Sequence, residues 1–179
     1  MADKSSNKGA NTKNEKIKEF YALVDDIKLA MLVTQTPDGA LVSRAMQTQK
    51  RRPGVDMWFV TSTETHKVAE LEANPEVNVA YVDTSSRDWI SVSGTAKISQ
   101  NRDLIRELYE PDWKAWFPEK SSDMDGSTED PRIVIIDIEA HNVTYLKGMD
   151  SRPVALFKVL KAMATGTAPD LGETKTITK

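Results

Sequence analysis

The ten residues from Trp58 to Lys67 carry the side chains best suited to bind an anion. An aromatic strand segment leads through hydroxyl residues to the expected start of a helix, where free backbone amides and the helix dipole favour negative charge. The candidate contacts in this segment are Thr61, Ser62, Thr65, His66 and Lys67. An equally acceptable interpretation is that Thr63 only caps the helix while Lys67 is solvated.

Arg44 is a second cation that could meet an anion. It lies near the middle of a predicted strand, with Ala45, Met46 and Gln47 directly after it. An arginine in such a setting indicates contact with an anion or with a partner subunit. A salt bridge on an edge strand is the alternative interpretation.

Aromatic side chains could form the walls of a ligand site or of an interface. Trp113 and Trp116 are three residues apart, so a helical turn would place them on the same side, a spacing more typical of a core or an interface than of a ligand wall. Trp89 opens a strand, where it could pack on a neighbour or cover a ring. Exposed tryptophans at positions 89, 113 and 116 would present much apolar surface to water, which predicts a homodimer.

Composition limits the kind of protein that this chain can be. Its 179 residues, 39% hydrophobic and 28% charged, suit one soluble domain. No apolar run approaches the roughly 20 residues that span a bilayer, and the polar start lacks the pattern of a secretory signal. We therefore expect a cytoplasmic protein without membrane contact.

Metal, thiol and nucleic-acid chemistry receive little support. The chain has no cysteine, and its two histidines, His66 and His141, fit no metal-binding spacing. The net charge of −3 gives no general attraction to nucleic acid. The one basic run, Lys50 to Arg52, precedes Pro53 and Gly54 and is typical of a solvated turn.

Hydrophobic periodicity and turn residues predict about seven strands with peripheral helices. Helices are expected at 14–28, 64–73, 101–108 and 153–164, and strands at 30–35, 40–49, 56–61, 77–82, 89–99, 133–138 and 143–146. Short connections favour a mainly β fold, an antiparallel barrel, over a doubly wound sheet. The predicted domain covers residues 14–165, between a disordered tail at 1–13 and a flexible tail at 166–179.

Several segments, in order, resemble the FMN-binding split-barrel family, the pyridoxamine 5'-phosphate oxidase-like proteins. The hairpin from Ala30 to Met46 includes the turn Thr-Pro-Asp-Gly, and Trp-Phe-Val-Thr-Ser follows with Lys67 six residues beyond Thr61. Further on come Glu-Leu-Glu-Ala-Asn-Pro-Glu-Val and Ser-Gly-Thr-Ala. The general stress protein group of this family is particularly similar, over about Lys16 to Tyr145.

The resemblance implies a split antiparallel barrel that binds FMN at the interface of a homodimer. Arg44 and Lys67 would hold the phosphate, helped by hydroxyl groups, with His66 beside them. Backbone groups around Ala45, Met46 and Gln47 would meet the flavin ring edge. The aromatic residues assigned to the ring by the same resemblance are Trp58 and Phe59, and from the second subunit Trp89, Trp113 and Trp116.

One departure from the family pattern narrows the function. The stretch from Tyr145 to Arg152 lacks the Arg-and-His pair with which true pyridoxamine phosphate oxidases bind the substrate phosphate, so vitamin B6 oxidation is not expected. Three functions stay open: an FMN-binding stress protein that sequesters flavin or performs simple redox chemistry, an NAD(P)H-dependent flavin reductase, and a cofactor-free interaction module. A flavin supplies its own chemistry, so sequence does not separate the first two.

Overall fold

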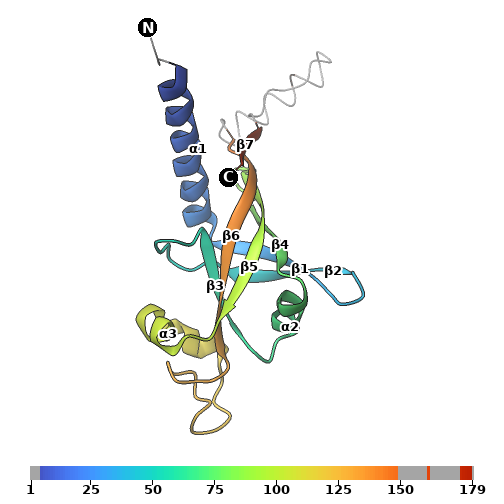
Figure 1. Ribbon diagram of the computed structural model, residues 1–179, viewed down its shortest axis with the longest axis vertical. Helices are drawn as coiled ribbons and strands as arrows, with labels where there is room; N and C mark the ends of the chain where they lie inside the picture. Colours follow the sequence, from blue (N-terminus) through green and yellow to red (C-terminus); the bar gives the residue numbers. More distant parts are fainter. Residues whose placement is uncertain (1–4, 149–160, 162–173, 179) are drawn as a thin grey trace.

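A computed structural model describes residues 5–148, 161 and 174–178 of the chain. It is a mainly antiparallel sheet with three α-helices and one 3₁₀ helix (Figure 1). In chain order the elements are α1 Ser5–Ile27, β1 Leu29–Gln35, β2 Leu41–Gln47, β3 Met57–Ser62, α2 His66–Ala73, β4 Glu76–Val82, β5 Trp89–Ser99, α3 Arg102–Leu108, η1 Pro111–Trp116, β6 Ile133–Leu146 and β7 Thr174–Thr178.

The strands run in the order β2-β1-β4-β5-β6-β3, and β7 pairs with the second half of β6. Every ladder is antiparallel. The sheet curls into the predicted split barrel, and β2 and β3 form the two ends of the strand order. The split therefore lies between the strands that carry Arg44 and Thr61.

The β1–β2 hairpin forms as its turn residues predict. Gly39 has φ of 89°, a conformation that residues with a Cβ rarely adopt, and it follows Pro37 and Asp38. The hairpin register pairs Leu32 with Arg44 and Thr34 with Val42. Because side chains alternate across a strand, Leu32, Thr34 and Arg44 lie on one face of the hairpin.

Helix α1 contributes its apolar stripe to the barrel core. Phe20, Leu23 and Val24 are buried, and Ile17 and Ile27 pack beside them, as the spacing of three and four residues predicts. They join alternate residues of the strands, among them Leu32, Phe59 and Val79, in one cluster. Burial of this stripe explains why a helix with many charged residues stays attached to the barrel.

A second, smaller cluster covers the outside of β3 and β6. It is made of Trp58, Ile105, Trp113, Phe117, Ile133 and Ile135. Helix α3 packs on β3 and β6 through Ile105. Asn101 caps the start of this helix, and its side chain accepts a hydrogen bond of 3.1 Å from the amide of Leu104. The predicted helix after Asn101 is thereby confirmed, as is its end before Pro111.

The structure differs from the sequence expectations at three places. The segments 133–138 and 143–146 belong to one strand, β6, because polar Glu139 and Asn142 continue to pair with β5. A bulge opposite Ser93 and Gly94 accommodates the one extra residue of β6. A Cβ on Gly94 would lie 2.3 Å from the carbonyl oxygen of Glu139, so this position needs glycine.

The two predicted tails contain regular structure. Helix α1 begins at Ser5 rather than at residue 14, and Thr174–Thr178 is strand β7, which is rich in β-branched residues. The expected domain bounds, 14–165, leave the start of α1 and the whole of β7 outside the domain. A helix predicted at 153–164 lies outside the described residues, apart from position 161.

Within the described residues, no helix is both long enough and apolar enough to span a membrane.

Candidate functional site

The candidate site lies where strand β2 and the start of α2 meet at the split of the barrel. Arg44 comes from β2, and Thr61 and Lys67 come from the end of β3 and the first turn of α2. One backbone hydrogen bond, of 3.1 Å from the amide of Gln49 to the carbonyl of Trp58, joins the two sides of the split. The fold thus brings together the two cations that the sequence singled out.

Arg44 is half-buried and held by two oxygen atoms. Its Nη2 lies 2.8 Å from Oε1 of Glu70, and its Nη1 donates a hydrogen bond of 2.5 Å to Oγ1 of Thr34. The edge-strand salt bridge considered for Arg44 is therefore present in the structure. The acidic partner lies on α2, three residues after Lys67 and on the same helix face.

Lys67 is buried, with only 8% of its surface exposed, which rules out a solvated helix lysine. Its Nζ donates a hydrogen bond of 2.9 Å to Oγ1 of Thr61. Burial, and then repulsion by Arg44, lower the pKa of Lys67, while attraction by Glu70 opposes them. A buried ammonium group that donates its hydrogen bond to a neutral hydroxyl, rather than to a carboxylate, is well placed to bind an anion.

The turn before α2 leaves the helix start without a side-chain cap. The N-cap residue is Thr65, not Thr63, and its hydroxyl donates to the carbonyl of Ser62 at 2.7 Å instead of accepting from the helix. The hydroxyls of Thr61 and Thr65 are 3.4 Å apart. Hydroxyl groups, helix amides and Lys67 therefore converge in a donor-rich corner.

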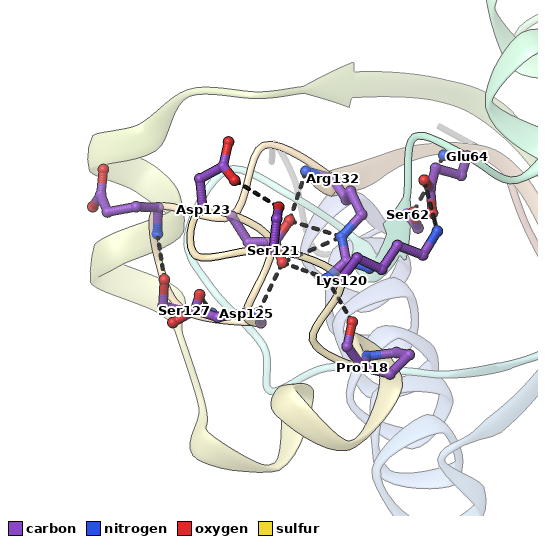
Figure 2. Close-up of polar contacts among 12 residues, drawn as sticks. Ser62, Glu64, Pro118, Lys120, Ser121, Asp123, Asp125, Ser127 and Arg132 are labelled. Atoms are coloured by element: carbon purple, nitrogen blue, oxygen red, sulfur yellow. Dashed lines mark hydrogen bonds and ion pairs between the residues drawn. The ribbon is translucent and has the colours of Figure 1, made fainter.

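The loop between η1 and β6 braces this turn from outside. The amide of Thr63 donates a hydrogen bond of 2.8 Å to the carbonyl of Arg132, and Lys120 forms an ion pair of 2.7 Å with Glu64. Figure 2 shows Lys120 extending from the loop to Glu64 beside Ser62. The turn before α2 is thus held on both of its sides, by β3 and by the loop.

Asp130 and Arg132 form the buried centre of that loop. Arg132 Nη2 lies 2.6 Å from Asp130 Oδ2 and also donates to the carbonyl of Pro118 at 3.0 Å (Figure 2). Asp130 accepts further hydrogen bonds from the amides of Gly126 and Arg132. The hydrogen bonds from Arg132 outweigh the opposing effect of burial and lower the pKa of Asp130 to about 2.

The residues assigned to the flavin ring edge follow Arg44 along β2. Ala45 and Gln47 are exposed, and Met46 is buried in the barrel core. Next to Gln47 opens a groove of about 860 Å³, lined by the end of α1, by Gln47–Arg52, by Trp58 and by Glu107–Asp112. With a rise of about 3.3 Å per strand residue, Gln47 lies about 10 Å from Arg44 along β2.

The aromatic candidates lie in different environments. Phe59 is fully buried in the barrel core, while Trp58 and Trp113 pack edge to face at 6.1 Å in the second cluster. Trp89 is half-buried, and Trp116 is 79% exposed. Trp113 and Trp116 differ in burial although a 3₁₀ helix brings residues three apart to the same side. Trp113 packs in the second cluster, whereas Trp116 is the last residue of η1 and stays exposed.

Sequence reasoning missed two residues of the site, Glu70 and Thr34. The carboxylate of Glu70 accepts a hydrogen bond of 2.5 Å from the hydroxyl of Thr34 and faces Arg44. A signal was available for both. Glu70 follows Lys67 by three residues in a helix, and Thr34 is a polar residue at an inward position of a strand whose neighbouring inward residues, Ala30 and Leu32, are apolar.

The fold and the cationic site together define a class of protein. The family model for proteins like pyridoxamine 5'-phosphate oxidase matches residues 15–170, and the chain belongs to this family. The match begins within α1, includes strands β1 to β6, and ends before β7.

Individual relatives agree with this assignment. The protein bli-3 of Neurospora crassa is 34% identical over 135 residues, which cover 74% of this chain and 65% of that protein, so the chain spans less than two thirds of its length. General stress protein 26 of Bacillus subtilis is 30% identical over 106 residues, 58% of this chain and 70% of that protein. A crystal structure of a general stress FMN/FAD binding protein from Xanthomonas citri has the same fold, with a TM-score of 0.63 at 21% identity over 77% of this chain and 92% of that one.

Proposed function

We propose that this protein binds FMN, holding the phosphate between Arg44 and Lys67 at the split of the barrel, and that it acts as a flavin-binding protein of the general stress type. The observation that carries the proposal is the convergence of these two cations with the hydroxyl of Thr61. FMN, when bound, would supply hydride or electron transfer at its ring. This chain's residues would bind and orient it.

The donor set suits a phosphate. Arg44 and Lys67 bring two positive charges against one negative charge from Glu70, and the hydroxyl of Thr61 adds a neutral donor. Ser62 and exposed His66 lie at the rim of the same turn. A phosphate ester near neutral pH carries between one and two negative charges, which would compensate the excess positive charge.

The remainder of FMN would follow β2 towards the groove. In this arrangement backbone groups at Ala45, Met46 and Gln47 meet the ring edge. Trp58 lines the groove, but with 3% of its surface exposed it could offer the ring only a small edge. Phe59 could contribute only its backbone, because its side chain is buried in the core. Trp89 and Trp116 are the tryptophans with surface left to offer a flavin across a subunit interface, whereas Trp113 has almost none.

The first prediction tests the cofactor. Protein incubated with FMN and desalted should keep a flavin absorption spectrum near one equivalent per subunit, whereas riboflavin, which lacks the phosphate, should be removed. Each charge-assisted contact to the phosphate contributes about 1.5–3 kcal/mol, so FMN should bind at least about ten-fold more tightly. Equal retention of the two flavins would refute the phosphate site.

We further propose a homodimer with FMN at its interface. The outer face of β1, β2 and β4 carries exposed apolar side chains, which are Leu29, Met31, Leu41 and Val82. Strand pairing places Met31 between Ala45 and Ala80 on this face. A contiguous apolar face of this kind is typical of an interface, and a better reason for a dimer than the tryptophans, of which Trp113 is buried.

A second prediction follows for the oligomeric state. Light scattering should give a mass near twice 20.0 kDa for the wild type, and Met31→Glu should give monomers because a charge on the outer face would be desolvated in the dimer. Ala22→Glu introduces the same charge at an exposed position of helix α1, outside that face, and should stay dimeric. A wild-type mass of one subunit at micromolar concentration would reject the dimer.

The flavin chemistry can be tested separately from binding. Reduction of bound FMN by NADH or NADPH under anaerobic conditions would favour a reductase, and its absence would favour a carrier or another electron donor. Pyridoxine phosphate is not expected to reduce the flavin. A protein that retains no flavin at all would return the cofactor-free interaction module to consideration.

A further inference from the structure

A buried carboxylate stands inside the proposed phosphate site. Glu70 is only 5% exposed, yet it lies on the same face of α2 as Lys67. Its two oxygens are both engaged: Oε1 with Nη2 of Arg44 at 2.8 Å, and Oε2 with the hydroxyl of Thr34 at 2.5 Å. Thr34 in turn accepts from Nη1 of Arg44. The three side chains form a closed ring of hydrogen bonds.

The negative charge of Glu70 would repel a phosphate bound beside it, so another effect of Glu70 must favour phosphate binding if this acid is part of the site. A guanidinium group has five N–H donors in a rigid fork, and Glu70 and Thr34 use one N–H on each terminal nitrogen. Three N–H groups of the guanidinium therefore remain for other acceptors. A long side chain that is fixed before the ligand arrives loses less conformational entropy on binding.

We propose that Glu70, together with Thr34, is the positioning residue of the phosphate site: it fixes the guanidinium of Arg44 so that its free edge faces the phosphate. This inference rests on the proposed FMN function and deepens it. Glu70 acts through Arg44 and makes no contact with the ligand.

The charge of Glu70 also supports Lys67. Arg44 and Lys67 are close enough for Arg44 to lower the pKa of Lys67, and Glu70 counters this effect. Removing the carboxylate would leave two cations facing each other in a buried site and would favour the neutral form of Lys67. Burial raises the pKa of Glu70, but the hydrogen bonds from Thr34 and Arg44 outweigh it, so the carboxylate stays ionised.

The proposal predicts an effect opposite in sign to simple electrostatics. If Glu70 only repelled the phosphate, Glu70→Gln would tighten FMN binding. If Glu70 positions Arg44, Glu70→Gln should weaken FMN binding by about ten-fold, and Thr34→Val by a smaller factor, while riboflavin affinity stays unchanged. Glu72→Gln is the matched control, because it removes the same charge from the exposed side of the same helix.

A double-mutant cycle decides whether Glu70 acts through Arg44. In the Arg44→Ala background, Glu70→Gln should cause no further loss of FMN affinity. Titrations of the four proteins with FMN and with riboflavin, by flavin fluorescence quenching, give the required ratios. The glutamine keeps the size of the side chain, so the variant is expected to fold, and Thr34→Val probes the same ring of hydrogen bonds independently.

The outcomes separate this inference from the proposed function. A wild type that binds FMN and riboflavin equally refutes the function itself. A wild type that prefers FMN, with Glu70→Gln binding FMN as tightly as before or more tightly, overturns the positioning role. Equal loss of FMN and riboflavin affinity in Glu70→Gln would also overturn it, since that result indicates general damage to the fold.

Discussion

Replacing Asp130 by Asn should lower the free energy of unfolding by about 3–5 kcal/mol, because it leaves the guanidinium of Arg132 buried without its anion. Both side chains are almost fully buried, and three of their contacts join atoms within 3.0 Å. The partner charge cannot move to water without unpacking the loop. Urea denaturation of the variant and the wild type measures the difference.

A matched control comes from an exposed ion pair. Asp103 lies 2.7 Å from Arg106, but the Asp103 side chain is 92% exposed, so Asp103→Asn should change the free energy of unfolding by less than about 1 kcal/mol. A similar loss of unfolding free energy in Asp130→Asn and Asp103→Asn would show that burial of the Asp130–Arg132 pair does not increase its contribution to stability.

The same pair gives a pH dependence with a definite sign. The pKa of Asp130 is about 2 in the folded protein against an ordinary 3.8, so the folded state holds the ionised form more strongly than the unfolded state does. Its stabilising contribution is complete above the ordinary value and is lost as the pH falls from there towards about 2. Over this acidic range the stability of the wild type should fall more steeply than that of Asp130→Asn.

Lys67→Met should reduce FMN affinity by about ten- to a hundred-fold, because it deletes a charge-assisted contact of about 1.5–3 kcal/mol while keeping most of the buried side-chain volume. Arg44→Ala should reduce it at least as much, since a guanidinium can grip two phosphate oxygens. Riboflavin affinity should hardly change in either variant. Paired titrations with the two flavins are the measurement.

The structure separates these two variants by their effect on stability. Lys67→Met removes a buried cation, so the thermal midpoint without flavin should hold or rise. Arg44→Ala leaves Glu70 buried without its ion partner and should lower the midpoint.

The matched control is Lys114→Met on η1, which changes an exposed lysine and should alter neither the FMN affinity nor the thermal midpoint. Unchanged FMN affinity in Lys67→Met would remove Lys67 from the phosphate site.

Local features of the sequence were sufficient for much of the fold. Runs of β-prone residues between turn residues predicted β1 to β5. Asn101, Pro111 and Gly39 marked a helix start, a helix end and a turn through their own backbone preferences. The same reasoning failed at β7 and in the middle of β6. These segments are strands because of the neighbours with which they pair, which local pattern does not reveal.

For the candidate site too, the sequence indicated some features and only the tertiary structure decided the others. Residue types alone made Thr61 to Lys67 a candidate anion site and Arg44 a candidate second cation, each with an equally acceptable alternative interpretation. Only the tertiary structure decided that Arg44 meets Glu70, 26 residues later, that Lys67 is buried, and that Trp113 belongs to a core while Trp116 does not. The physical reason is that burial and charge pairing depend on which elements pack together, and the closing of the barrel brings β2 to α2 across a distance in sequence that no local preference spans.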